Sequence, residues 1–112
     1  MFTKRKVKRI HLVYYLLVFD RKTDKLVGNV VDITTGGMKL MSKEPVKPGT
    51  VHHFRMALPG EMGGSKEIVF EAKSVWSKNN LYSDFYGTGF VFEKIADDDI
   101  AVIRDLIDRF GY

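Results

Sequence analysis

Apolar and polar residues alternate with a period of two along most of this chain, and this alternation predicts strands. The clearest case runs from Ile68 to Trp76, where Glu71 and Lys73 fall between apolar or small residues. There we expect one buried face made of Ile68, Phe70, Ala72, Ser74 and Trp76. The complete set of predicted strands is Ile10–Phe19, Leu26–Thr34, Met38–Ser42, Val51–Leu58, Ile68–Trp76 and Tyr86–Phe92.

Turn-forming residues separate these strands. The charged segment 20–25 predicts a hairpin that pairs the first two strands antiparallel, and residues 78–84 predict a polar loop. Gly36 and Gly37 permit the positive φ angles of a tight turn. Gly87 and Gly89 indicate a close backbone approach or a bend in the last strand.

From Asp97 the apolar period changes to 3.6, which predicts a helix over residues 97–110. Its apolar stripe is Ile100, Ile103, Leu106, Ile107 and Phe110. Three aspartates at residues 97–99 offer an N-cap and favourable charge at the helix start, and Gly111 is a suitable stop. Six short strands and one helix predict a mainly β fold: a six-stranded antiparallel β-barrel with a C-terminal α-helix.

The 112 residues predict a single domain, made of an arm (1–9), a barrel (10–92) and a helix (97–110). The arm contains five of the 18 basic residues, between Lys4 and Arg9, so the remainder has 13 basic and 14 acidic residues. Because the arm also has little apolar surface to bury, we expect it to be irregular or flexible until it meets an anionic ligand or folds back on the barrel.

Several function classes have little support in the sequence. The chain has no cysteine, which excludes disulfides, thiolate metal sites and a cysteine nucleophile and suits the cytoplasm. His52 and His53 are adjacent and should face opposite sides of a strand, so we expect surface or turn-adjacent histidines and no metal site. No nucleophile has an adjacent base, so we expect no enzyme. The apolar run at residues 12–19 is too short to span a bilayer, and we predict no membrane insertion.

Two short motifs do carry candidate chemistry. The first is Arg5-x-x-x-Arg9 in the arm, and the second is Asp32-x-Thr34-x-x-Gly37 at the end of the second strand. Taken singly, each has a simpler interpretation: a solvated basic tail for the first, and a turn in which Asp32 and Thr34 bond to local backbone for the second. Their conjunction, in this order and within a barrel pattern, favours a binding site.

Together these motifs resemble the paired signature of PilZ domains, small split β-barrels that bind the bacterial second messenger cyclic di-GMP. The resemblance covers nearly the whole chain, although the family's usual hydroxyl residue is serine where this chain has Thr34. It implies that Arg5 and Arg9 wrap the ligand against the barrel. It also implies that Asp32, Thr34, Gly36 and Gly37 form the facing half of the site, with Lys4 and Lys8 as auxiliary groups.

The expected function is therefore a non-enzymatic cyclic di-GMP receptor without another cofactor, which changes its arm conformation and signals to a protein partner. Two alternatives stay open. One is a PilZ-like adaptor that acts through protein contacts without nucleotide. The other is an oligonucleotide-binding barrel, although outside the arm the charge gives DNA or RNA no basic track to follow, so we expect no nucleic-acid partner.

Overall fold

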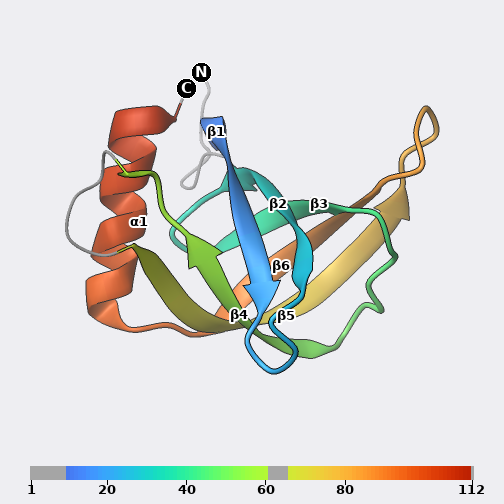
Figure 1. Ribbon diagram of the computed structural model, residues 1–112, viewed down its shortest axis with the longest axis horizontal. Helices are drawn as coiled ribbons and strands as arrows, with labels where there is room; N and C mark the ends of the chain where they lie inside the picture. Colours follow the sequence, from blue (N-terminus) through green and yellow to red (C-terminus); the bar gives the residue numbers. More distant parts are fainter. Residues whose placement is uncertain (1–9, 61–65, 112) are drawn as a thin grey trace, which may run out of the picture.

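The computed structural model describes residues 10–60 and 66–111, with side chains from residue 16 onward. The described part of the chain forms six strands followed by one helix (Figure 1). The elements are β1 (Ile10–Asp20), β2 (Leu26–Ile33), β3 (Gly37–Ser42), β4 (Val51–Ala57), β5 (Glu67–Asn79), β6 (Tyr86–Lys94) and α1 (Asp97–Phe110).

The strands close into a barrel in the order β1-β2-β3-β6-β5-β4, and every neighbouring pair is antiparallel. The barrel closes where β1 pairs with β4, with Val18 opposite Met56 and Phe19 opposite Arg55. The sequence prediction of a six-stranded antiparallel barrel followed by a helix is therefore confirmed, as is the pairing of the first two strands.

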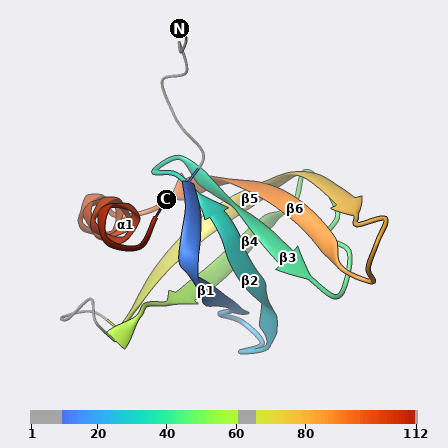
Figure 2. The same cartoon turned by 90° about the horizontal axis from the view of Figure 1, so that it is seen from above.

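The core lies between the inner faces of the strands and one face of α1. Figure 2 shows the helix nearly end-on beside the barrel, and its Ile103 and Leu106 are fully buried. They join one continuous cluster with barrel residues such as Phe54 and Leu40. Burial of these side chains is the main favourable term for the fold and holds α1 against the barrel.

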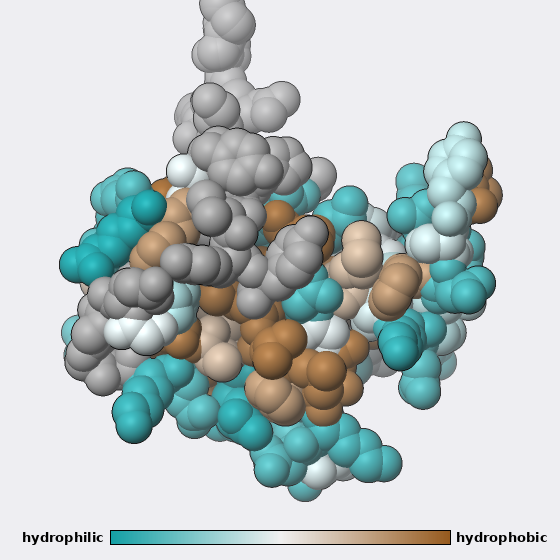
Figure 3. Space-filling view, turned by 45° about the horizontal axis from the view of Figure 1, so that its top comes forward, coloured by the Kyte–Doolittle hydropathy of each residue, from teal (hydrophilic) through white to brown (hydrophobic). Residues whose placement is uncertain are grey.

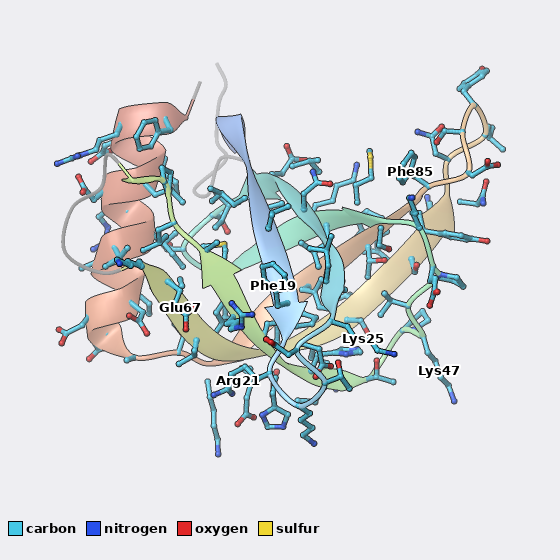
Figure 4. The ribbon with its side chains drawn as sticks, in the orientation of Figure 1. Phe19, Arg21, Lys25, Lys47, Glu67 and Phe85 are labelled. Atoms are coloured by element: carbon cyan, nitrogen blue, oxygen red, sulfur yellow. The ribbon has the colours of Figure 1, made fainter. Side chains whose placement is uncertain are left out.

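Outside the core, Arg55 ties β4 to its neighbours. Its guanidinium carbon lies 4.3 Å from the centroid of the Phe19 ring, and its nitrogens donate to Glu67 at 3.3 Å and to Asp24. Figure 4 labels Phe19 and Glu67 on the two sides of β4. The contact with Phe19 reinforces the β1–β4 pair, which closes the barrel.

The β5–β6 ribbon is longer than the alternation predicted. The expected loop began at residue 78, but β5 continues to Asn79 and the turn occupies residues 80–85. Lys78 and Asn79 stay in the strand because they pair with Gly87 and Tyr86 of β6, which also pair with β3. Only the turn at residues 80–85 projects beyond the paired strands (Figure 1). Ser77 and Thr88 join the two strands through their hydroxyls, 2.9 Å apart.

Two expectations about local conformation were wrong. The helix begins at Asp97 as predicted, but its N-cap is Ala96 and no side chain caps it; the three aspartates occupy the first turn, where they still favour the helix dipole. The expected positive φ at Gly36 and Gly37 is also absent: among the described residues only Asp24 and Gly49 have positive φ.

Candidate functional site

The turn between β2 and β3 is held by Thr34. Its amide donates to the carbonyl of Gly37 at 2.9 Å, and its hydroxyl oxygen accepts from the amides of Gly36 at 3.1 Å and Gly37 at 3.2 Å. The hydroxyl also donates to the Gly37 carbonyl at 3.4 Å. Thr34 therefore makes the local turn that the simpler interpretation of the motif anticipated, and its side chain fixes the backbone of both glycines.

Gly37 is needed for space, not for an unusual φ angle. A Cβ at Gly37 would overlap the backbone oxygen of Phe90, because β3 approaches β6 closely there. Gly36 is exposed, and a Cβ there would meet only the Thr34 hydroxyl at 3.8 Å. Its carbonyl accepts from the amide of Phe92 at 3.0 Å, which ties the turn to β6.

Asp32 lies near the end of β2 and is only 4% exposed. An irregularity in the β2–β3 register between Val30 and Asp32 pairs Asp32 with Lys39, so that Ile33 and Met38 pair next and lie in the core. On its other side, Asp32 pairs with His11 of β1. The irregularity thus places the carboxylate outside the core, beside the start of β1.

A pocket of about 220 Å³ opens where these residues meet. It is lined by Asp32, Thr34 and Gly37 from the predicted site, together with Lys39, Trp76 and Gly89. Gly36 adjoins it through the turn. The fold therefore gathers the three defining residues of the second motif around one opening. The predicted residues of the arm, which are Lys4, Arg5, Lys8 and Arg9, lie outside the described residues.

Trp76 was predicted to share the inner face of its strand, and this was wrong. The β5–β6 register shifts between Ser74 and Trp76, so that Trp76 pairs with Gly89 and Ser77 pairs with Thr88. Thr88 is buried, whereas Trp76 is half-buried and lies on the outside with Lys39. The Lys39 ammonium lies 5.8 Å from the centroid of the Trp76 ring system.

Sequence reasoning therefore missed Lys39 and Trp76 as residues of this pocket. One signal was available: two glycines spaced by one residue, Gly87 and Gly89, suggested a close approach on one face of β6. The side chain that approaches Gly89 is Trp76, because a Cβ there would overlap the indole nitrogen. The register shift that turns Trp76 outward has no signature in the alternation itself.

The histidines of β4 give no sign of metal chemistry. The histidines were expected at the surface or beside a turn. His52, the second residue of β4, is half-buried at the edge of the core: its ring stacks on Phe54 at 5.3 Å and meets Phe90 edge-on at 5.8 Å. His53 faces the other way, with Nδ1 3.6 Å from a carboxylate oxygen of Glu71. Within residues 10–60 and 66–111 no three histidine or carboxylate side chains are grouped to hold a metal ion.

The same described ranges contain no helix with the length and apolarity needed to cross a membrane.

These features define a class of protein: a small closed barrel with a flanking helix and an outer pocket at the β2–β3 turn. The family model for the PilZ domain matches residues 3–109, so the chain belongs to the PilZ domain family. A comparison with curated protein sequences finds no significant match.

Solved structures support the fold assignment. MotI/DgrA, the inhibitor of motility of Bacillus subtilis, has a TM-score of 0.72 and 19% identity, over 96% of this chain and 52% of its own. MrkH of K. pneumonia in its apo state has a TM-score of 0.76 and 16% identity, over 94% and 50%. YcgR of Escherichia coli, in complex with c-di-GMP, has a TM-score of 0.69 and 15% identity, over 94% and 45%. The chain thus spans about half the length of each.

Proposed function

We propose that this chain is a receptor for cyclic di-GMP, that it performs no catalysis, and that residues 1–112 act as one PilZ unit. Membership of the family supports this function, and two proteins of similar fold, MrkH and YcgR, have structures solved as complexes with c-di-GMP. The observation that carries the proposal is that Asp32, Thr34 and Gly37, the second motif of the family, line one pocket.

The pairing of β1 with β2 supports a role for the arginine motif at this pocket. The first residue of β1, Ile10, pairs with Ile33, and the next, His11, pairs with Asp32. Arg9 directly precedes Ile10 in the chain, so the arginine motif comes immediately before the strand whose first two residues pair with Ile33 and Asp32. This order supports the proposal that the arginine motif and the Asp32 motif act on the same ligand.

Each group has a role that its chemistry suits. A carboxylate accepts two hydrogen bonds, so Asp32 takes the N1 and N2 donors of a guanine edge. The forked guanidinium groups of Arg5 and Arg9 bind phosphate oxygens or the O6 and N7 acceptors of guanine. Lys4 and Lys8 add positive charge that attracts the phosphates.

Thr34 has a different role from Asp32. Because its hydroxyl already bonds to Gly36 and Gly37, it shapes the turn, and the turn leaves room for ligand beside the backbone. The extra methyl of threonine relative to serine does not prevent these bonds. We therefore assign Thr34, Gly36 and Gly37 to holding the site open, and Asp32 to reading the base.

Signalling follows if a protein partner distinguishes the ligand-free arm from the ligand-bound arm, because a ligand shifts an equilibrium only through states that differ in affinity. The proposed partner is a protein, not DNA or RNA. The proposed place of action is the cytoplasm, because the second messenger is found there. One observation favours the adaptor alternative. The Thr34 hydroxyl donates one hydrogen bond and accepts two within its own turn, so it has none to offer a nucleotide.

The test is a calorimetric titration of the chain with cyclic di-GMP, with GTP and a short single-stranded oligonucleotide as controls. We expect saturable binding of cyclic di-GMP alone, weakened by Arg9→Ala by about 1–3 kcal/mol. Arg104→Ala is the matched control, since Arg104 is exposed on α1. A folded protein that binds no cyclic di-GMP supports the adaptor, and tight oligonucleotide binding supports the nucleic-acid alternative.

A further inference from the structure

The site does not end at Asp32, because one row of paired residues crosses four strands on the outside of the barrel. Asp32 on β2 pairs with Lys39 on β3, Lys39 pairs with Gly89 on β6, and Gly89 pairs with Trp76 on β5. Neighbouring strands lie about 4.8 Å apart, so the row places Trp76 roughly 14 Å from Asp32 along the surface. Three side chains of different chemistry, an acid, a base and an indole, therefore follow one line.

The glycines of β6 determine how these side chains lie. A Cβ at Gly89 would overlap the indole nitrogen of Trp76, so the absence of a side chain lets the ring rest on the β6 backbone. A Cβ at Gly87 would meet Cε of Lys39 at 3.1 Å. Lys39 from one side and Trp76 from the other thus lie over β6, and the lysine ammonium ends 5.8 Å from the centroid of the ring system.

Trp76 also connects two hollows of the surface. It lines the pocket that contains Asp32, and it lines a second groove of about 520 Å³ that continues along β5 toward the turn at residues 80–85. Lys39 lines both hollows as well, and Lys78 and Asn79 line the outer part of the second. Over both hollows the lining therefore combines cations, amide groups and aliphatic side chains with two aromatic residues, the half-buried Trp76 and the buried Phe90.

This combination suits a nucleotide. An indole supplies a flat surface on which a purine stacks, and an ammonium beside it neutralises a phosphate. A cyclic dinucleotide presents two bases and two phosphates, so it can offer one base to Asp32, a phosphate to Lys39 and the other base to Trp76. Aliphatic residues also border the opening, with Val75 and Val91 beside the row.

We propose that Lys39 and Trp76 form a second contact region for cyclic di-GMP, in which Trp76 stacks on a guanine and Lys39 binds a phosphate. This inference rests on the proposed function. It extends the site from the β2–β3 turn to β5, beyond the residues of the two signature motifs.

Trp76 is the single tryptophan of the chain, so its fluorescence reports directly on this region. The experiment is a titration of the full chain with cyclic di-GMP, followed by calorimetry and by tryptophan fluorescence in parallel. We expect saturable quenching with the same dissociation constant as the calorimetric binding. We also expect Trp76→Leu to bind at least about fivefold more weakly, and Trp76→Phe, which keeps a ring, to lie between it and the wild type.

A lysine pair provides the electrostatic control. Lys39→Gln should weaken binding more than Lys25→Gln does, because Lys25 lies in the β1–β2 hairpin, at the opposite end of β2 from Asp32 (Figure 4). Calorimetric binding with unchanged fluorescence, and with Trp76→Leu as tight as wild type, would overturn the inference and leave the proposed function intact. If the wild type gives no binding heat, the proposed function fails, and the inference fails with it.

Discussion

Asp32 and Trp76 lie at the two ends of one cross-strand row, with Lys39 and Gly89 between them. Two register irregularities produce this relationship, one in β2 before Asp32 and one in β5 before Trp76. Each irregularity places a side chain, Asp32 in β2 and Trp76 in β5, on the outer face of the barrel instead of the inner face. The outer face of β2, β3, β6 and β5 therefore carries Asp32, Lys39 and Trp76 in one row, with Val75 and Val91 beside it. Figure 3 shows hydrophobic side chains gathered in the middle of the face that it draws.

Asp32 should determine the choice of base. Asp32→Asn keeps the size of the side chain but replaces one acceptor by a donor, so it no longer matches the two donors of guanine. We expect a loss of about 1–3 kcal/mol in the binding of cyclic di-GMP and a much smaller change for cyclic di-AMP. Calorimetry with both nucleotides measures the difference, and an equal loss for both would remove base recognition from Asp32.

The Thr34 hydroxyl should matter for stability more than its methyl does. Thr34→Val keeps the shape but leaves the amides of Gly36 and Gly37 without their acceptor. We expect the free energy of unfolding to fall by about 1–2 kcal/mol, while Thr34→Ser stays close to wild type. Urea denaturation of both variants measures this. Equal stability of Thr34→Val and wild type would show that the turn does not depend on the hydroxyl.

The two glycines of the turn should respond differently to the same substitution. Gly37→Ala places a Cβ against the carbonyl oxygen of Phe90, so β3 and β6 must separate, and we expect a destabilisation of about 1–3 kcal/mol. Gly36→Ala is the matched control, because its Cβ has space and its φ is not positive; a change within about 0.5 kcal/mol is expected. Similar urea midpoints for the two variants would contradict the close approach at Gly37.

His52 should make the fold less stable in mild acid. Burial against Phe54 lowers the pKa of His52 below its ordinary value of 6.5; Asp20 opposes this shift and His53 adds to it. The unfolded chain then takes up the proton more readily than the folded chain does. The contribution of His52 to the free energy of unfolding is therefore complete above pH 6.5, and it is lost as the pH falls through the pKa of His52 in the folded state.

The measurement is the urea midpoint at pH 7.5 and pH 5.5 for the wild type and for His52→Gln. The variant should lose less stability between the two pH values than the wild type does. A wild-type midpoint that rises on acidification, or an identical pH dependence in the variant, would contradict this assignment.

The strand alternation and the change to a period of 3.6 were sufficient to predict the barrel and its helix, because burial on one face dictates both patterns. They failed at the irregularities. A strand that gains one residue in its register shows no change in composition, so the outward placement of Trp76 could not be predicted from Ser74 and its neighbours. The position of Asp32 beside β1 likewise depends on pairing between distant strands. Lys39 belongs to no sequence motif, and only its pairing with Asp32 and Gly89 on the neighbouring strands identifies it as part of the pocket.

The same limit applies to the turn. The sequence predicted that Gly36 and Gly37 mark it, but glycine has two uses, an unusual φ angle and close approach. For Gly37 the position of Phe90 on β6 decides in favour of close approach, whereas Gly36 shows neither use. The helix start shows a similar ambiguity, because aspartates suit both the cap and the first turn, and here they occupy the first turn.

The most direct test of the proposed site is a nuclear magnetic resonance titration of the isotopically labelled chain with cyclic di-GMP. We expect the largest shifts of backbone amide signals at residues 32–39 and at Gly89, together with the indole signal of Trp76, and little change in the β1–β2 hairpin at residues 20–25. Shifts concentrated on α1 or at the β1–β2 hairpin, or no shifts at saturating ligand, would contradict the account.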